Sequence, residues 1–287
     1  MVISISRRCD IPRFDFNWFW EKLEAGFVKV KNPFNPNQIR RVSLLPPAPE
    51  RPAAESAELL AFWTRDPGFI LKYTEELERR GYKFFVMCSL TSYPAILEPN
   101  APSTEAVIET MKLLSEKTSL SRVIWRYDPL FFSNLTDFEF HRRNFANLAA
   151  RLGGTVNRVI LSVYDEYKKA EKRLKALEQS GCLKRPALCS TGLPDPAVRE
   201  LLAELAQIAR REGIEIQSCA EKDLSDCGIK PGACINGEYI FEHFGLTNDG
   251  RDRNQRPNCL YVKSVDIGSY GSCPAACVYC YAHSREP

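Results

Sequence analysis

The sequence lacks long apolar runs and a strong excess of charge of either sign. None of the apolar stretches among its 287 residues approaches the roughly 20 residues of a membrane-spanning helix, which argues against a membrane protein. The formal net charge of +3 is too small to indicate a nucleic-acid or membrane-surface partner by itself. There is also no internal repeat and no low-complexity segment. The composition, 44% hydrophobic and 26% charged, is that of an ordinary globular chain with enough length for one large core.

The N-terminus does not have the order of a signal peptide. Its charges, Arg7 and Arg8, follow the apolar run over 2–5, whereas a signal peptide places its charges first. We therefore expect a cytoplasmic protein. In that compartment, 11 cysteines favour metal or redox chemistry over a disulfide scaffold.

Short apolar strands alternate with helical patterns along most of the chain. The alternation indicates parallel strands, because each parallel crossover needs a helix-length connection. We predict an α/β fold of the TIM-like (β/α)8 barrel type over residues 1–220, made irregular by a short proline-rich crossover after the second strand. Residues 221–287 form an irregular, cysteine-rich, cluster-binding extension packed on the barrel mouth, within one structural unit. The eight predicted strands are 2–5, 42–45, 59–63, 84–88, 123–129, 159–163, 187–189 and 214–219.

Charged residues stand at the predicted strand ends. Active sites of parallel α/β folds lie at the carboxyl ends of the strands, and charges next to apolar runs are costly to bury unless they are paired. Arg126 and Asp128 allow two interpretations. They form an ion pair that plugs the barrel rim, or Arg126 joins Arg7 and Arg65 in a site for an anionic substrate or a cofactor carboxylate.

The densest chemical signal is a three-cysteine motif near the C-terminus. Cys273, Cys277 and Cys280 follow the spacing C-x3-C-x2-C, and three thiolates on so short a loop can converge on one point. Three ligands on a [4Fe–4S] cluster leave one iron open to a substrate or cofactor. The aromatic ring of Tyr279 would shield the cluster from water. The alternatives are a zinc knuckle, with His283 or Cys259 as the fourth ligand, or free thiols on a disordered tail.

The remaining cysteines suggest a second, weaker site. Four of them follow the eighth predicted strand and are candidates for a second cluster: Cys219, Cys227, Cys234 and Cys259. Cys9 lies at the mouth of the first strand and is a candidate ligand or redox partner. Cys88 and Cys189 fall in predicted strands and are interpreted as core residues, and Cys182 in a loop as incidental.

Two resemblances follow from these motifs. The loop from Cys273 to Cys280 resembles the cluster motif of radical S-adenosylmethionine enzymes, and of spore photoproduct lyase in particular. Nearly the whole chain resembles the domain of unknown function 1848 family, through the segments 6–12, 62–67, 125–129, 264–270 and the cysteine loop. The resemblance implies a C-terminal cluster site like the N-terminal one of radical enzymes, and it implies no known reaction.

These observations lead to one main hypothesis for function. The chain is expected to be a [4Fe–4S] enzyme of the radical S-adenosylmethionine type, with a small-molecule substrate and an electron donor as partners. The residues expected to orient the ligand are Arg7, Arg65, Arg126 and Asp128, and those expected to bind the cofactor are Arg8, Asp10 and Tyr279.

Two alternatives stay open. The first is a non-radical iron–sulfur enzyme with Lewis-acid or sulfur-transfer chemistry, favoured because the sequence lacks the Gly-Gly-Glu motif that holds the amino group of S-adenosylmethionine in radical enzymes. The second is a non-catalytic metal-binding or electron-transfer protein. DNA repair is a weaker extension of the lyase resemblance, and the near-neutral charge does not support it.

Overall fold

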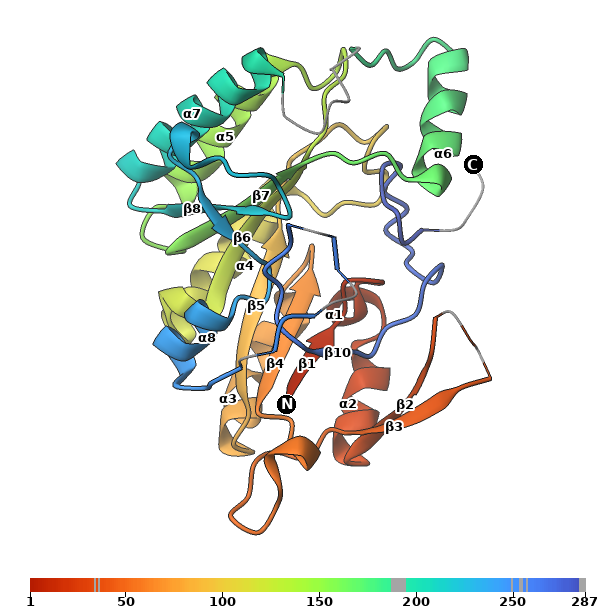
Figure 1. Ribbon diagram of the computed structural model, residues 1–287, viewed down its shortest axis with the longest axis vertical. Coiled ribbons are helices and arrows are strands. Elements are labelled where there is room, and N and C mark those ends of the chain that lie inside the picture. The colour runs from red at the N-terminus through yellow and green to blue at the C-terminus, as the bar shows by residue number, and fades with distance from the viewer. Residues whose placement is uncertain are drawn as a thin grey trace.

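The computed structural model describes residues 1–33, 35, 37–186, 195–248, 250–252, 255–256 and 258–283. Its centre is an eight-stranded sheet in the order β10-β1-β4-β5-β6-β7-β8-β9, in which every neighbouring pair is parallel (Figure 1). The strands are β1 (Val2–Ile5), β4 (Leu59–Thr64), β5 (Lys83–Ser89), β6 (Val123–Leu130), β7 (Arg158–Val163), β8 (Glu215–Cys219), β9 (Lys230–Gly232) and β10 (Val265–Asp266). The mixed α/β class and the parallel sheet are therefore confirmed. No pairing between β9 and β10 closes this sheet within the described part of the chain.

Both faces of the sheet are covered, which is why its strands read as nearly continuous apolar runs. All four residues of β1 and all six of β4 are buried. Alternate residues enter separate cores: Leu60 and Phe62 pack on one face, and Leu59 and Ala61 on the other.

The helices divide unequally between the two faces. The first face carries side chains of α2, α3, α4, α5 and α7, and the second carries those of α8. The buried residues of α6 instead pack against the C-terminal segment. The helices are α1 (Ile11–Phe14), α2 (Phe16–Glu24), α3 (Gly68–Arg79), α4 (Thr104–Lys117), α5 (Phe138–Leu152), α6 (Lys168–Gln179), α7 (Pro196–Arg211) and α8 (Gly237–Phe244). None of these helices is both long enough and apolar enough to cross a membrane.

The prediction of a second parallel strand over 42–45 is wrong. Residues in this region form β3 (Ile39–Ser43), which pairs antiparallel with β2 (Phe27–Lys31) in a separate two-stranded sheet. A short connection suffices for an antiparallel hairpin, so this pair needs no helical crossover. Figure 1 shows the hairpin standing beside α2, away from the main sheet.

The seventh predicted strand, over 187–189, lies outside the described residues, as do Cys189 and the other residues of 187–194. β7 and β8 nevertheless pair with each other directly, from Arg158 opposite Glu215 to Leu161 opposite Ser218.

The chain beyond β8 supplies both edges of the sheet, although its sequence suggested little regular structure. β9 extends one edge, and β10 crosses to the other edge and pairs with β1. The side chain of Asp266 fixes this crossing. It accepts hydrogen bonds from the hydroxyls of Ser4 (2.9 Å) and Ser6 (2.6 Å), and from the backbone amides of Arg7 (3.0 Å) and Gly268 (3.0 Å). The C-terminal segment is thereby placed beside the end of the first strand.

Candidate functional site

A cavity of about 450 Å³ lies at the carboxyl ends of the strands. Ends of β1, β4, β6 and β7 form one part of its wall, and residues from 255 onward form another. The predicted site residues that line it are Arg7, Arg8, Asp10, Arg65, Arg126, Asp128, Cys219, Cys234, Cys259, Cys273, Cys277, Tyr279 and Cys280. Cys9 also lines the cavity. Cys227, and His283 as the alternative fourth zinc ligand, do not belong to this lining. The fold therefore brings together residues as far apart in the chain as Arg7 and Cys280.

The cysteine loop places all three motif thiols on the cavity wall. The amide of Gly271 donates to the carbonyl of Ala282 at 2.8 Å and closes the base of the loop. The amide of Ala282 donates to the sulfur of Cys280 at 3.4 Å. Amide donors of this kind stabilise a thiolate, and hydrogen bonds to sulfur are among the factors that tune iron–sulfur clusters.

Arg173 of α6 binds the backbone of the same loop. Its guanidinium donates to the carbonyls of Val278 (3.0 Å), Cys280 and His283 (3.1 Å). Arg173 is itself buried, and burial lowers its pKa from the ordinary value. Three hydrogen bonds from one rigid group fix the path of the backbone on both sides of Cys280.

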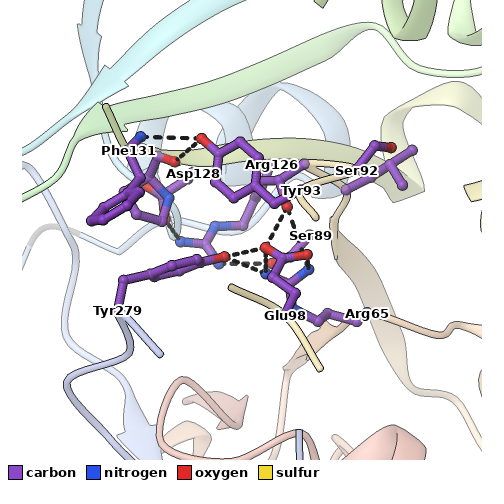
Figure 2. A network of polar contacts seen from close by, with 12 residues as sticks. Arg65, Ser89, Ser92, Tyr93, Glu98, Arg126, Asp128, Phe131 and Tyr279 are labelled. Atoms are coloured by element: carbon purple, nitrogen blue, oxygen red, sulfur yellow. Dashed lines mark hydrogen bonds and ion pairs between the residues drawn. The ribbon is translucent and has the colours of Figure 1, made fainter. Parts of the chain in front are cut away.

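A buried network joins the loop to β4 (Figure 2). Arg65 follows β4 and donates to both carboxylate oxygens of Glu98 at 2.8 Å. The same guanidinium donates to the hydroxyl of Tyr279 at 2.8 Å, and this hydroxyl donates to Glu98. Thr91 adds a further hydrogen bond to Glu98 at 2.6 Å. Arg65 and Tyr279 are thus engaged with Glu98, an arrangement that anchors the loop.

Arg126 and Asp128 form the ion pair expected from their spacing on β6 (Figure 2). Arg126 also donates to Ser89 at 3.1 Å and lies over the ring of Trp63, 4.7 Å from its centroid. Ser162 donates to Asp128. The Nε of Arg126 is buried and has no hydrogen-bond partner in the described part of the protein. The pair therefore forms part of the cavity wall, and the Nε–H of Arg126 remains available as a hydrogen-bond donor.

Arg7 and Arg8 both face Asp266, which was not predicted as a site residue. The Nε of Arg7 lies 4.0 Å from this carboxylate and the Nε of Arg8 lies 3.7 Å from it. Each guanidinium also lies over a tyrosine ring, that of Tyr261 for Arg7 (5.3 Å) and that of Tyr270 for Arg8 (5.0 Å). The cavity wall next to the cysteines is therefore cationic and aromatic.

Asp10 has a structural role in addition to its place in the lining. It caps α1 by accepting from the amide of Arg13 at 3.1 Å, and it accepts from the amide of Arg65 at 2.8 Å. Burial raises the pKa of its carboxyl to about 6, against the lowering effect of these amides.

The donor set suits a thiolate-bound group in chemistry and position, but it is not preassembled. Cys273, Cys277 and Cys280 share one cavity, with an amide donor on one sulfur. No group of three or more His, Cys, Asp or Glu side chains in the described ranges is arranged to hold a metal ion as it stands. The residues that would hold such a group are therefore Cys273, Cys277 and Cys280.

The other cysteines separate into two kinds. Cys219, Cys234 and Cys259 are buried on the cavity wall, and the sulfurs of Cys219 and Cys234 lie 3.5 Å apart. Cys227 belongs to the core on the opposite face of the sheet and contacts Asp226. Cys88 is buried within β5, and Cys182 is exposed.

Sequence reasoning missed Glu98, Arg173 and the role of Asp266. Glu98 lies in an irregular segment with no motif around it, and Arg173 reads as one of several charges on a polar helix. Asp266 stands in the segment 264–270 that carried the family resemblance, which was the only signal for it.

Comparisons with known proteins give a family and little else. A family model described as "Domain of unknown function (DUF1848)" matches residues 2–282. No curated protein matches the chain. One similar solved structure contains the tandem GH20 catalytic modules of the pneumococcal exo-β-D-N-acetylglucosaminidase StrH. It has 10% sequence identity and a TM-score of 0.39 over 79% of this chain and 83% of that one, a likeness too low to indicate function.

Proposed function

Because the chain belongs to the domain of unknown function 1848 family, whose description assigns no activity, we propose its function from the cavity itself. The protein is an iron–sulfur enzyme of the radical S-adenosylmethionine type. Cys273, Cys277 and Cys280 hold a [4Fe–4S] cluster that has one iron without a protein ligand. The observation that carries the proposal is the placement of all three motif thiols on the wall of a cavity that strand-end arginines also line.

The anchoring of the loop supports this proposal. A disordered three-cysteine tail would need neither the Arg65–Glu98–Tyr279 network nor the three hydrogen bonds from Arg173. Buried charged groups cost free energy unless they are paired and hydrogen-bonded. Arg65 and Arg173 are stabilised by contacts that also hold the loop in one position. Fixed ligand positions are what a cluster site requires.

The cluster would supply electron transfer and one open coordination position. The chain supplies binding and orientation. Arg7, Arg8 and Arg126 give the cavity wall positive charge that suits a carboxylate or another anionic group, and Asp128 fixes Arg126. Arg65 and Tyr279 position the loop and are not assigned a contact with the ligand.

The strand order supports a barrel-like placement of this site. From β1 to β9, the strands of the main sheet follow one another in the order in which they occur in the chain, as in a (β/α)8 barrel. β10 then returns to β1 and carries the cysteine loop to the mouth near the first strand. This position beside β1 supports the proposal of a C-terminal cluster site that resembles the N-terminal one of radical enzymes. An electron donor and a small-molecule substrate are the partners that this function requires.

The test is anaerobic reconstitution of the full chain with iron and sulfide, followed by electron paramagnetic resonance of the reduced protein. We expect about four irons per chain, and loss of this uptake in a Cys273→Ala/Cys277→Ala/Cys280→Ala variant. Cys182→Ala is the matched control, because this thiol is exposed and outside the cavity. Iron uptake that the triple substitution leaves unchanged would sink the cluster assignment.

Addition of S-adenosylmethionine to the reduced, reconstituted protein separates the two enzyme hypotheses. A change in the resonance spectrum supports binding at the open iron and the radical class. An unchanged spectrum favours non-radical iron–sulfur chemistry, in agreement with the missing Gly-Gly-Glu motif.

A further inference from the structure

Three cysteines outside the C-terminal motif meet at the end of β8. Cys219 is the last residue of β8, Cys234 follows β9, and Cys259 lies 25 positions further along the chain. The sulfurs of Cys219 and Cys234 are 3.5 Å apart, and the thiol of Cys259 interacts with that of Cys219. All three are free thiols, buried on the wall of the cavity.

Local structure holds these residues together. β8 and β9 are parallel and in register from Gln217 to Cys219, so the end of β8 and the segment that follows β9 emerge side by side. The segment around Cys259 is then fixed against both. The amide of Val262 donates to the carbonyl of Ile235 at 3.1 Å, and Arg256 donates to the carbonyl of Cys219 at 3.3 Å.

We propose that Cys219, Cys234 and Cys259 bind a single thiophilic metal ion of the zinc class, at a site separate from the cysteine loop of residues 273–280. Zinc–sulfur bonds of about 2.3 Å in a tetrahedral site set the sulfurs about 3.8 Å apart. The 3.5 Å between Cys219 and Cys234 is close to this edge length. A four-iron cluster binds each thiolate through a different iron, which keeps the sulfurs farther apart.

The charges around the three thiols favour their deprotonation on metal binding. One divalent ion displaces three thiol protons and gives a centre of net charge −1. The guanidinium of Arg126 interacts electrostatically with Cys219 and Cys234, and those of Arg7 and Arg256 with Cys259. Positive groups at this range stabilise an anionic centre in a poorly solvated site.

The chain offers three thiol ligands to such an ion. As they stand, no three such side chains among the described residues are arranged to hold a metal ion, so we expect binding to reorient the thiols. The protein then provides three thiolates, and the fourth position faces the cavity. Sites with three protein ligands and one open position are those in which zinc activates a water molecule or a substrate.

Cobalt(II) titration of the reduced, anaerobically purified full chain tests this proposal. Tetrahedral cobalt–thiolate sites show a sulfur-to-metal charge-transfer band and strong visible bands. We expect one equivalent of cobalt to bind with these bands and to be displaced by zinc. Cys234→Ser or Cys259→Ser should weaken the binding about 100-fold or more.

Two matched variants make the test specific. Cys227 lies in the same segment but outside the cavity, so the Cys227→Ser variant should bind cobalt as the wild type does. The Cys273→Ala/Cys277→Ala/Cys280→Ala variant should also retain the cobalt site. Circular dichroism of each variant verifies that it is folded.

Three results would overturn the proposal: no thiolate bands, equal loss of binding in Cys227→Ser, or loss in the 273/277/280 variant alone. A Cys219–Cys234 disulfide in the anaerobically purified protein, or iron with labile sulfide bound through Cys219, Cys234 and Cys259, would overturn it as well. The proposed iron–sulfur function is tested separately, by measuring iron uptake in the Cys234→Ser variant. Its outcome does not depend on whether the cobalt site is found.

Discussion

Arg65 holds both carboxylate oxygens of Glu98 at 2.8 Å in a pair that is almost completely buried. Glu98 is 2% exposed, and burial by itself would lower the pKa of Arg65, yet the neighbouring carboxylate keeps that pKa well above its ordinary value. The same guanidinium reaches Tyr279, so the cysteine loop rests on this ion pair.

Glu98→Gln should therefore be strongly destabilising. The substitution leaves the Arg65 charge buried without its partner, which typically costs 3–5 kcal/mol. Urea unfolding at neutral pH measures the change. The matched control is Glu76→Gln, which removes the solvent-accessible partner of Arg79 and Arg80 and should have little effect. Similar losses in the two variants would contradict the role of the buried pair.

Arg173→Met should loosen the cysteine loop more than the rest of the protein. It removes three hydrogen bonds to loop carbonyls while it keeps an apolar side chain of similar length. We expect Cys277 and Cys280 to react with iodoacetamide about tenfold faster in the metal-free protein, because local opening becomes easier. Mass spectrometry of the alkylated peptides measures the rates.

The control for this experiment is Lys175→Met, which removes an exposed cation from the same helix. Its alkylation rates should equal those of the wild type. If Cys88, which is buried in β5, becomes reactive in Arg173→Met to the same degree as Cys280, the effect is global unfolding and the local interpretation is wrong.

Gly268→Ala should disturb the junction between the C-terminal segment and β1. A Cβ atom at this position would lie 2.0 Å from the hydroxyl oxygen of Ser6 and 2.8 Å from the sulfur of Cys9. Because Ser6 is held by Asp266, the clash cannot be relieved without breaking that hydrogen bond. Overpacking of this kind costs about 1–3 kcal/mol. Thermal unfolding measures it, and Ser269→Ala, at the exposed neighbouring position, should leave the midpoint almost unchanged.

The sequence was most informative where strands are buried on both faces. β1, β4, β5 and β7 were located because they carry nearly continuous apolar runs. The predicted charged residues that follow the strands, such as Arg65 and Arg126, line the cavity. The hairpin of β2 and β3 was misassigned because Val42 and the residues after it read as a buried strand, although β3 carries exposed residues. Periodicity alone does not distinguish a hairpin strand from a sheet strand.

The short edge strands and the loop anchors lay beyond sequence reasoning. β9 and β10 have three and two residues, too few to show a period, and they are fixed by long-range contacts such as those of Asp266. Glu98 and Arg173 act through partners about 180 and 105 positions away, which no local pattern encodes. The approach of Cys219 to Cys234, and the exclusion of Cys227, likewise depend on the register of β8 and β9.

His141 of α5 should make stability fall on mild acidification. It is fully buried among aromatic rings, with Nδ1 3.0 Å from the hydroxyl oxygen of Tyr127 and Nε2 3.2 Å from the carbonyl oxygen of Phe131. Burial lowers its pKa to about 4, below the value of about 6.5 in the unfolded chain. Between these values the unfolded state binds a proton that the folded state does not, so stability is lost as the pH falls from about 6.5 toward 4.

The expected contribution of His141 is a loss of about 2 kcal/mol between pH 7 and pH 5. Urea unfolding at the two pH values measures it as the difference between the wild type and His141→Gln, which cannot take up the proton. The variant should be less stable at pH 7 but should have a smaller dependence on pH. His243→Gln changes an exposed histidine of α8 and should keep the wild-type dependence. If His141→Gln and the wild type lose the same free energy of unfolding between pH 7 and pH 5, then His141 is already protonated in the folded protein and its burial does not govern the acid sensitivity.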